Sequence, residues 1–274
     1  MRERPPLSGT VLITGASAGI GRALARRVCV EARRIVLVAR RTDRLETLAD
    51  ELLRVRVGLE VDVVTCDLAD ANAVDALCDR LVQEGGVDVL INNAGFGDRA
   101  RLEDADLSKL QRMVAVNVSA VVQLTGRLVL GMVERGHGGV LNVGSVLGHL
   151  YQPGVATYAG TKHFIAGFTD ALRSEVASAG VTVTEVCPGP VATEFREIAG
   201  GRGGVKPSPG VLRIDADTCA DEALRAFRRG RAVVFPGRLN RLLMRITSVV
   251  PRFVLRWLMA RSGAKTRARA LEEA

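Results

Sequence analysis

The stretch GTVLITGASAGIG, residues 9–21, decides the fold of this 274-residue chain. Its first part, Gly9–Thr14, is an apolar, β-branched run typical of a short strand, and helical spacing resumes after the stretch. The turn between them carries Gly15, Gly19 and Gly21. Glycine lets a backbone approach a pyrophosphate, which the N-terminus of the following helix attracts. The stretch therefore predicts a strand, a nucleotide-binding turn and a helix, although tight turns also use glycine for structural reasons alone.

A second strand indicates which nucleotide would bind. Arg34–Ala39 is an apolar run typical of a strand buried on both faces, and it ends in Arg40 and Arg41. In a dinucleotide-binding fold this end meets the adenine ribose, where an acid accepts from a free 2′-OH and an arginine pairs with a 2′-phosphate. The sequence has no acid there. Arg40, with Ser17 as a helper, favours NADP over NAD, whereas Arg41 also fits a solvated residue that starts the next helix.

Short β-rich segments alternate with amphipathic segments along most of the chain. This alternation predicts an α/β fold, a doubly wound parallel sheet of the Rossmann type in three layers, with ligands at the carboxyl ends of the strands. Further strands are expected at 61–66, 87–92, 139–144, around 182 and at 232–236. Asp67 and Leu68 follow one strand end. Asp67 suits contact with the adenine amino group or capping of a helix at Asp70–Gln83.

A tyrosine and a lysine one helical turn apart predict proton-transfer chemistry. Tyr158 and Lys162 lie at positions i and i+4, in a chain with only two tyrosines and four lysines, so a chance pair is improbable. A carbonyl that accepts hydride must also gain a proton. We expect the ammonium to favour phenolate and lower the phenol pKa from its usual value of about 10. Ser145, just past the fifth strand, can donate a hydrogen bond to the substrate oxygen.

Together these motifs resemble the short-chain dehydrogenase/reductase family over about residues 8–235. The resemblance implies one Rossmann-type domain, a nicotinamide cofactor and hydride transfer between an alcohol and a carbonyl. It implies that Asn117 holds a water in a proton relay to the lysine and that Thr193 contacts the nicotinamide carboxamide. The motifs that carry it are TGASAGIG (14–21), NNAG (92–95), Asn117, Ser145, Tyr158 with Lys162, and PGPVAT (188–193).

The expected cofactor is NADP(H), and the expected catalytic residues are Asn117, Ser145, Tyr158 and Lys162. The residues expected to bind the cofactor are Gly15, Ser17, Ala18, Gly19, Ile20, Gly21, Arg40, Arg41, Asp67, Leu68, Asn93, Ala94, Gly95, Tyr158, Lys162, Pro188, Gly189, Val191 and Thr193.

No metal site is expected, because the three histidines lack metal-like spacing. The five cysteines are odd in number and lack CxxC pairs, which favours a reduced cytoplasmic chain without disulfides. The first nine residues contain no apolar segment of a secretory signal.

The C-terminal part departs from the family pattern, since the chain continues about thirty-five residues past its last expected strand. We expect a catalytic domain at 1–237 and a basic amphipathic extension at 238–274. Between Ala223 and Leu271 there are twelve arginines, one lysine and no acid. Apolar residues recur at helical spacing from Leu239 to Leu258, with a break at Pro251. A helix at a membrane interface, a lid over the substrate and a helix docked on the protein or a second subunit all fit.

A glycine- and proline-rich segment, 194–217, lies where the family keeps a mobile substrate lid, and it could instead be a passive loop. With the apolar tail nearby, a lipophilic carbonyl or alcohol is the expected substrate.

The favoured function is an NADP(H)-dependent carbonyl reductase or alcohol dehydrogenase. The alternative is a nucleotide-binding regulatory or scaffold protein whose basic tail binds an anionic membrane or nucleic acid. The proton-transfer residues count against the alternative, and an aromatic content of 4% offers few stacking platforms for nucleic acid. We expect no nucleic-acid partner, peripheral contact with the inner membrane face through the tail, and a homodimer or homotetramer built through long helices near 107–134 and 157–178.

Overall fold

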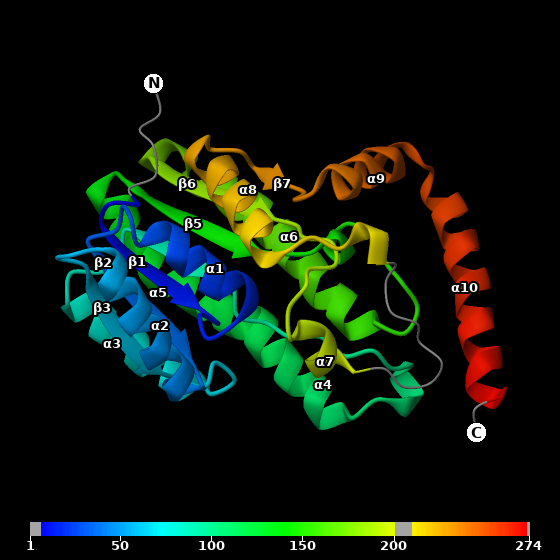
Figure 1. Cartoon of the computed structure of the whole chain (residues 1–274). Helices are drawn as coiled ribbons and strands as arrows, with labels where there is room; N and C mark the ends of the chain where they lie inside the picture. The colour runs from blue at the N-terminus through cyan, green and yellow to red at the C-terminus, as the bar shows by residue number, and fades with distance from the viewer. Residues whose placement is uncertain (1–6, 201–209, 273–274) are drawn as a thin grey trace.

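Seven parallel strands form one sheet in the order β3-β2-β1-β4-β5-β6-β7. The computed structural model describes residues 7–200 and 210–272 (Figure 1). In β1, Leu12 lies opposite Val36 of β2 on one side and Leu90 of β4 on the other. The strands are β1 (Thr10–Thr14), β2 (Arg34–Ala39), β3 (Glu60–Thr65), β4 (Val89–Asn92), β5 (Gly138–Val143), β6 (Val181–Val186) and β7 (Val233–Val234). Because strand order reverses between β1 and β4, the carboxyl ends of these two strands form the switch point where such sheets bind ligands.

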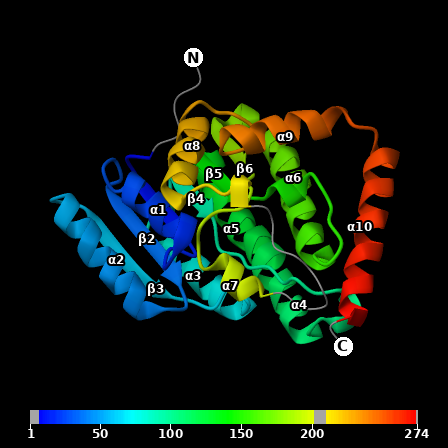
Figure 2. The same ribbon diagram turned by 45° about the vertical axis from the view of Figure 1, so that its right-hand side comes forward.

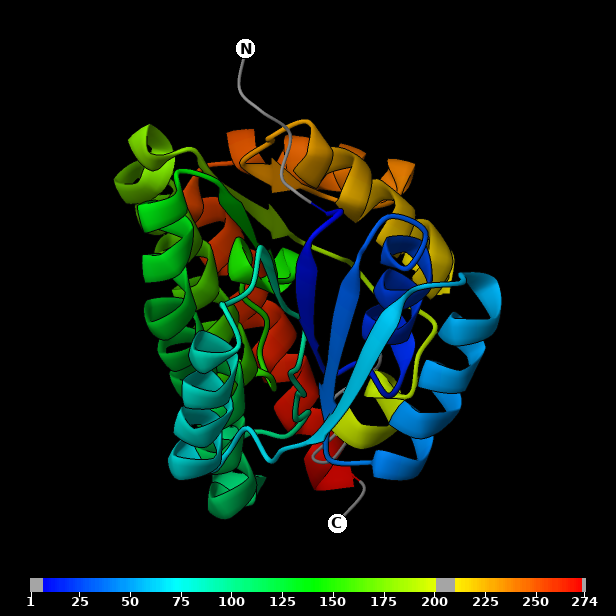
Figure 3. The ribbon, with the colours of Figure 1, turned by 90° about the vertical axis from the view of Figure 1, so that its left-hand side faces the viewer.

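Helices cover both faces of the sheet (Figure 3). One layer contains α1 (Gly19–Val28), α2 (Thr42–Val55) and α8 (Ala216–Arg228). The other contains α3 (Ala71–Gln83), α5 (Ala120–Arg135) and α6 (Ala156–Val176). The remaining helical segments are η1 (Leu102–Asp104), α4 (Leu107–Val114), the π-turn η2 (Ala115–Ser119), η3 (Val146–Gly148), η4 (Ala177–Ala179), α7 (Phe195–Ala199), η5 (Gly210–Leu212), α9 (Arg238–Val249) and α10 (Arg252–Glu272).

The strands divide the core into two apolar layers because successive side chains of a strand point to opposite faces. Val11 and Ile13 of β1 belong to the layer under α1, α2 and α8, and Leu12 belongs to the layer under α3, α5 and α6. Every residue of β1 is buried, as a central parallel strand requires. Phe227 of α8 is the largest fully buried side chain and packs in the first layer.

The segment Leu107–Arg135, which runs through α4, η2 and α5, is long and apolar enough to cross a membrane by length and composition. Its α5 part nevertheless packs on the sheet, with Leu124, Leu128 and Met132 buried in the second core layer. The apolar residues of α5 therefore serve to pack this helix on the sheet.

The chain ends in two helices that leave the three-layer body (Figure 2). They meet at the predicted break, since α9 ends at Val249 and α10 begins at Arg252, on either side of Pro251. The buried side chains of Asn240 and Met244 attach α9 to the body.

The predicted fold class is confirmed: the chain forms a doubly wound parallel sheet of the Rossmann type in a single domain. The predicted strands fall within about two residues of the observed ones, and β7 is shorter than expected because only Val233 and Val234 pair with β6. Within the expected lid, α7 and η5 are helical, whereas 201–209 lie outside the described residues. The division into a domain and an extension at residue 237 stays a prediction.

Candidate active site

The glycine turn after β1 has the backbone that a dinucleotide needs. Gly15 and Gly19 adopt φ angles of 67° and 55°, in the left-handed region that favours glycine. A Cβ at Gly15 would lie 2.8 Å from the Cα of Ala94, so the turn lies against the end of β4. Ala18 begins α1 without a side-chain capping bond, and the first turn contains no acid. The N–H groups there can bind a pyrophosphate, so these residues fit a dinucleotide cofactor.

Two side chains fasten this turn to β4. The backbone N–H groups of Asn93 and Ala94 each donate to the Thr14 hydroxyl at 3.0 Å. The Asn93 amide donates to the carbonyls of Thr14, at 2.8 Å, and Gly15, at 3.2 Å. Asn93, which we expected to touch the cofactor, therefore also shapes the turn. Thr14 was not among the expected site residues, although a hydroxyl at the end of a buried strand is a signal that could have indicated it.

The end of β2 carries a charged cluster that the sequence predicts only in part. It is Arg41, not Arg40, that reaches Ser17, since the Arg41 guanidinium donates to the Ser17 hydroxyl at 3.0 Å. Arg41 also pairs with Glu194 at 2.8 Å, and Arg44 pairs with the same carboxylate. Arg41 and Arg44 hold the pKa of Glu194 below its ordinary value. An acid therefore does lie at this end of the site, because the fold brings it from a distant segment.

Asp67 does not cap α3, because Asp70 accepts the N–H groups of Asn72 and Ala73 there. Asp67 instead pairs with Arg112 of α4 and accepts the Ala69 N–H at 3.1 Å. Burial tends to raise its pKa, but these two partners outweigh burial and lower it. Asp67 lines the cavity, so contact with a ligand remains the prediction for this residue.

A cavity of about 1040 Å³ joins the glycine turn to the predicted proton-transfer residues. All the residues expected to bind the cofactor line it except Gly21, and their roles stay predictions. A Cβ at Gly21 would lie 2.5 Å from the Gly15 carbonyl oxygen, so this glycine permits close packing of α1 on the turn. The lining set comprises Gly15, Ser17, Ala18, Gly19, Ile20, Arg40, Arg41, Asp67, Leu68, Asn93, Ala94, Gly95, Tyr158, Lys162, Pro188, Gly189, Val191 and Thr193.

Ser145, Tyr158 and Lys162 meet in this cavity. Ser145 follows β5 and caps η3, where it accepts the Leu147 N–H at 3.2 Å, and its hydroxyl also hydrogen-bonds with the Tyr158 phenol. The Lys162 ammonium lies 5.9 Å from the centre of the Tyr158 ring. It donates to the Val143 carbonyl at 2.7 Å. The end of β5 therefore fixes both the serine and the lysine around the phenol.

The expected effect of Lys162 on Tyr158 is wrong for this structure. Burial raises the pKa of Tyr158 to about 12, and the hydrogen bond with Ser145 offsets only part of that rise. Burial also lowers the pKa of Lys162 to about 8, against the attraction of Glu185. The sequence reasoning omitted the desolvation of both groups, which favours their neutral forms. The phenol is therefore protonated at neutral pH, which suits a proton donor.

Asn117 lies behind the cavity in the π-turn η2 and does not line it. Its amide group exchanges two hydrogen bonds with the Phe96 backbone, at 2.9 and 3.1 Å, and donates a third to the Thr161 hydroxyl at 3.1 Å. Thr161 in turn donates to the Tyr158 carbonyl at 2.8 Å. Asn117 therefore fixes the backbones of Phe96 and Tyr158, and the predicted water relay stays a prediction.

A partly buried polar cluster near Lys162 was not predicted from the sequence. Glu185 of β6 is 1% exposed at its side chain and lies 3.1 Å from His149, and Cys187 lies 3.4 Å from the same imidazole nitrogen. The bond to Glu185 raises the pKa of His149, and burial raises that of the Cys187 thiol well above its usual range. The three donor atoms lie within 4.8 Å of one another. The neighbouring Lys162 ammonium disfavours a metal cation, so we interpret the cluster as a hydrogen-bonded ion pair.

Residues after β6 close one side of the cavity. Phe195 of α7 packs on Tyr158, with ring centres 5.6 Å apart. Thr193 packs on the glycine turn, since a Cβ at Gly19 would lie 3.0 Å from its methyl group. Asn240 and Leu243 of α9 also line the cavity. Asn240 donates to the carbonyls of Leu212 and Pro236, which the sequence pattern of an apolar helix did not indicate.

Comparison with known proteins identifies the class to which this fold and site belong. The family model for short chain dehydrogenase matches residues 9–200, and the chain therefore belongs to the short-chain dehydrogenase/reductase family.

A sulfoacetaldehyde reductase 2 of Chromohalobacter salexigens is 38% identical over 199 residues, which cover 71% of this chain and 77% of that protein. A solved short-chain dehydrogenase from Sphingobium yanoikuyae, in complex with NADPH, has a TM-score of 0.77 and 29% identity over 89% of this chain and 96% of its own. The bulky-bulky ketone specific alcohol dehydrogenase from Comamonas testosteroni has a TM-score of 0.73 and 27% identity over 88% and 94% of the two chains.

Glu185 should control the protonation of His149. The pKa of His149 is raised in the folded protein, so protonated His149 stabilises the fold. This stabilisation is fully present below the pKa of the unfolded state and is lost as pH rises through the pKa of the folded state. In Glu185→Gln we expect NMR titration to give a lower pKa for His149, and the free energy of unfolding to fall less as pH rises above the ordinary histidine pKa of about 6.5. Glu175→Gln, which removes an exposed carboxylate of α6, is the control. Identical His149 curves in all three proteins would contradict the ion pair.

Proposed function

We propose that the protein is an NADP(H)-dependent oxidoreductase that interconverts a carbonyl and an alcohol. The observation that carries this proposal is the meeting of Ser145, Tyr158 and Lys162 in the same cavity as the glycine turn. A binding protein needs no phenol held beside a serine and a lysine, so this geometry counts against the regulatory or scaffold alternative.

Ser145, Tyr158 and Lys162 have separate roles in the reaction. When bound, the nicotinamide ring supplies or accepts a hydride. In the reducing direction the Ser145 hydroxyl donates a hydrogen bond to the substrate oxygen while negative charge develops on it. Tyr158, which is protonated at neutral pH, transfers its proton to that oxygen. The positive charge of Lys162 stabilises the phenolate that remains, and oxidation runs through the same residues in reverse.

A 2′-phosphate fits the cluster at the end of β2. Arg41 and Ser17 already share a hydrogen bond on the cavity wall, and Arg40 lines the cavity beside them. Arg44 lies close enough to share the Glu194 carboxylate with Arg41. Three cations oppose one acid here, which supports NADP(H) over NAD(H). The relative from Sphingobium yanoikuyae was solved with NADPH, which agrees with this choice.

A lipophilic substrate fits the part of the cavity beyond Tyr158. The apolar side chains of the lining that we assign to this part are Phe96, Leu147, Leu150, Val155, Phe195, Ile198, Leu212 and Leu243, and polar side chains such as Gln152 and Arg213 line the cavity as well. Side chains of this kind favour an extended apolar group on the carbonyl compound. The Comamonas testosteroni relative is described as specific for bulky-bulky ketones, which is compatible with this class of substrate.

Exposed apolar side chains on the long helices support a homodimer or homotetramer. They are Leu107, Val114, Val122, Leu130 and Val133 along α4 and α5, and Phe164 on α6. Sedimentation equilibrium tests this, since replacing Leu130 with Arg should lower the molecular mass of the assembly. All five cysteines are buried free thiols, which supports the proposed cytoplasmic location.

Tyr158→Phe should lower turnover by roughly 10²–10⁴-fold, because a positioned proton donor contributes about that much. The measurement is NADPH oxidation over aliphatic ketones of graded chain length, with NADPH affinity followed by titration calorimetry. The wild-type rate should rise with chain length, and the affinity for NADPH should change little in the variant.

Tyr151→Phe is the matched control, because Tyr151 does not line the cavity and its hydroxyl donates to the Arg252 carbonyl. Equal turnover by wild type and Tyr158→Phe would refute the role of the phenol. Equal rates on short and long ketones would remove the support for a lipophilic substrate.

Glu194→Gln should tighten NADPH binding by about two- to fivefold, the range expected for a partly exposed charge interaction. The reason is that Glu194 competes with a 2′-phosphate for Arg41 and Arg44. Calorimetry with NADPH and NADH measures the change, and Glu197→Gln, on the same short helix, is the control. If the wild type binds NADH more tightly and Glu194→Gln reverses that order, Glu194 is a ribose-binding acid and the NADP assignment is wrong.

A further inference from the structure

The two C-terminal helices form a basic arm, which we define as Arg238–Glu272. This segment contains eight arginines, one lysine and one glutamate, a net charge of +8. That equals the net charge of the whole chain, so the rest of the molecule is neutral in sum. The arm is therefore the part of the protein that an anionic surface attracts most strongly.

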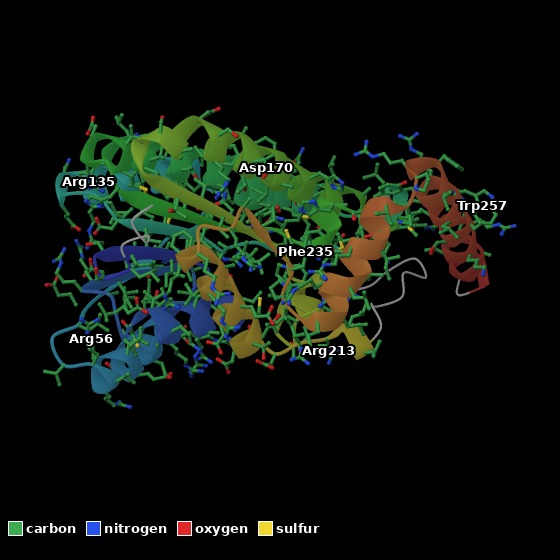
Figure 4. The ribbon with its side chains drawn as sticks, turned by 90° about the horizontal axis from the view of Figure 1, so that it is seen from above. Arg56, Arg135, Asp170, Arg213, Phe235 and Trp257 are labelled. Carbon is green, nitrogen blue, oxygen red and sulfur yellow. The ribbon has the colours of Figure 1, made fainter. Side chains whose placement is uncertain are left out.

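Large apolar side chains of the arm face solvent. Phe253 is 72% exposed, and Trp257, the only tryptophan of the chain, is 53% exposed with the Arg261 guanidinium stacked 4.0 Å from its ring centre. Figure 4 labels Trp257 on α10 at the end of the molecule opposite Arg56. The other exposed apolar residues of the arm are Leu239, Leu242, Ile246, Val249 and Leu258. Helices at a membrane interface carry arginine and lysine on one face and Trp, Phe or Leu on the other. In α9 the two kinds of residue segregate in this way, whereas in α10 the arginines lie among the apolar residues.

Contacts with the body hold the arm beside the active-site cavity. Tyr151 donates to the carbonyl of Arg252 at 3.4 Å, and its neighbours Leu150 and Gln152 line the cavity. Farther along α10, Arg267 pairs with Glu103 of η1 at 3.1 Å. Within α9, Leu243 faces the cavity while Leu242 is exposed. The outward surface of the arm thus adjoins the part of the cavity that we assign to the substrate.

We propose that the arm docks on an anionic lipid bilayer and brings the substrate end of the cavity to the membrane surface. Trp257 and Phe253 would enter the boundary between headgroups and acyl chains, and the arginines would contact lipid phosphates. Glu272 and Glu273 weaken this attraction only slightly, because the arm has nine cationic side chains.

Two other occupants of this surface fit less well. In a symmetric pair of chains the same patch would meet itself, and two surfaces of charge +8 would repel each other. Nucleic acid would satisfy the arginines but would leave Phe253, Val249 and Leu258 exposed to water, because phosphate and sugar offer them no apolar partner.

Vesicle binding tests the proposal on the full chain. Sedimentation with vesicles of phosphatidylcholine alone is compared with vesicles that also contain phosphatidylglycerol, and the emission of Trp257 is recorded in the same samples. We expect binding at least about tenfold tighter to the anionic vesicles, weakened by salt, with a blue shift of the Trp257 emission.

The double variant Val249→Glu, Phe253→Glu keeps Trp257 as the reporter and should lose at least about tenfold in vesicle affinity. Its matched control is Val55→Glu, Val57→Glu, which places the same charges on exposed valines on either side of Arg56, at the opposite end of the molecule (Figure 4). The control should bind vesicles at least ten times more tightly than the arm variant.

The proposal goes beyond the proposed oxidoreductase activity, and its test does not depend on turnover. An inactive protein that binds anionic vesicles would support the arm proposal while refuting the enzyme. Failure of the wild type to sediment, or equal binding by the arm variant and its control, would overturn it. So would a blue shift of Trp257 that follows protein concentration without lipid, or one caused by a DNA duplex and not by vesicles.

Discussion

The hydrogen bonds between Thr14, Asn93 and the glycine turn are the constraint on which the site depends. They hold the end of β1 against the end of β4, at the point where the direction of strand addition reverses. A parallel sheet places all its carboxyl strand ends along one edge, so residues far apart in sequence converge there. The glycine turn, Asp67 after β3 and Ser145 after β5 reach the same cavity for this reason.

Much of this arrangement could be predicted because it follows from periodicity and local geometry. The apolar run at Arg34–Ala39 and the glycines of the first turn have direct physical consequences for strand burial and backbone conformation. Tyr158 and Lys162 share a helix, so their spacing fixes their proximity. Glu185 illustrates what the sequence does not reveal: it lies between Thr184 and Val186 in a buried strand, and only the packing of His149, which follows η3, shows that its carboxylate has a partner.

Electrostatic effects in the site were harder to predict than positions. A lysine ammonium beside a phenol lowers the phenol pKa when both groups stay equally hydrated. Here burial removes water from both groups, and this desolvation is the largest cause of both pKa shifts. The same limit applies to the end of β2. The two residues directly after that strand are arginines, whereas Glu194 reaches Arg41 and Arg44 from a segment about 150 residues away. Contacts of such sequence separation depend on the tertiary fold.

Glu194 and Phe195 are neighbours in the chain but touch opposite ends of the cavity. The carboxylate pairs with Arg41 and Arg44 at the end of β2, and the ring packs on Tyr158 at the other end. One short segment therefore contacts both ends of the cavity. The two ends of the cavity therefore share one wall segment, which an ion pair holds at one end and a ring contact holds at the other.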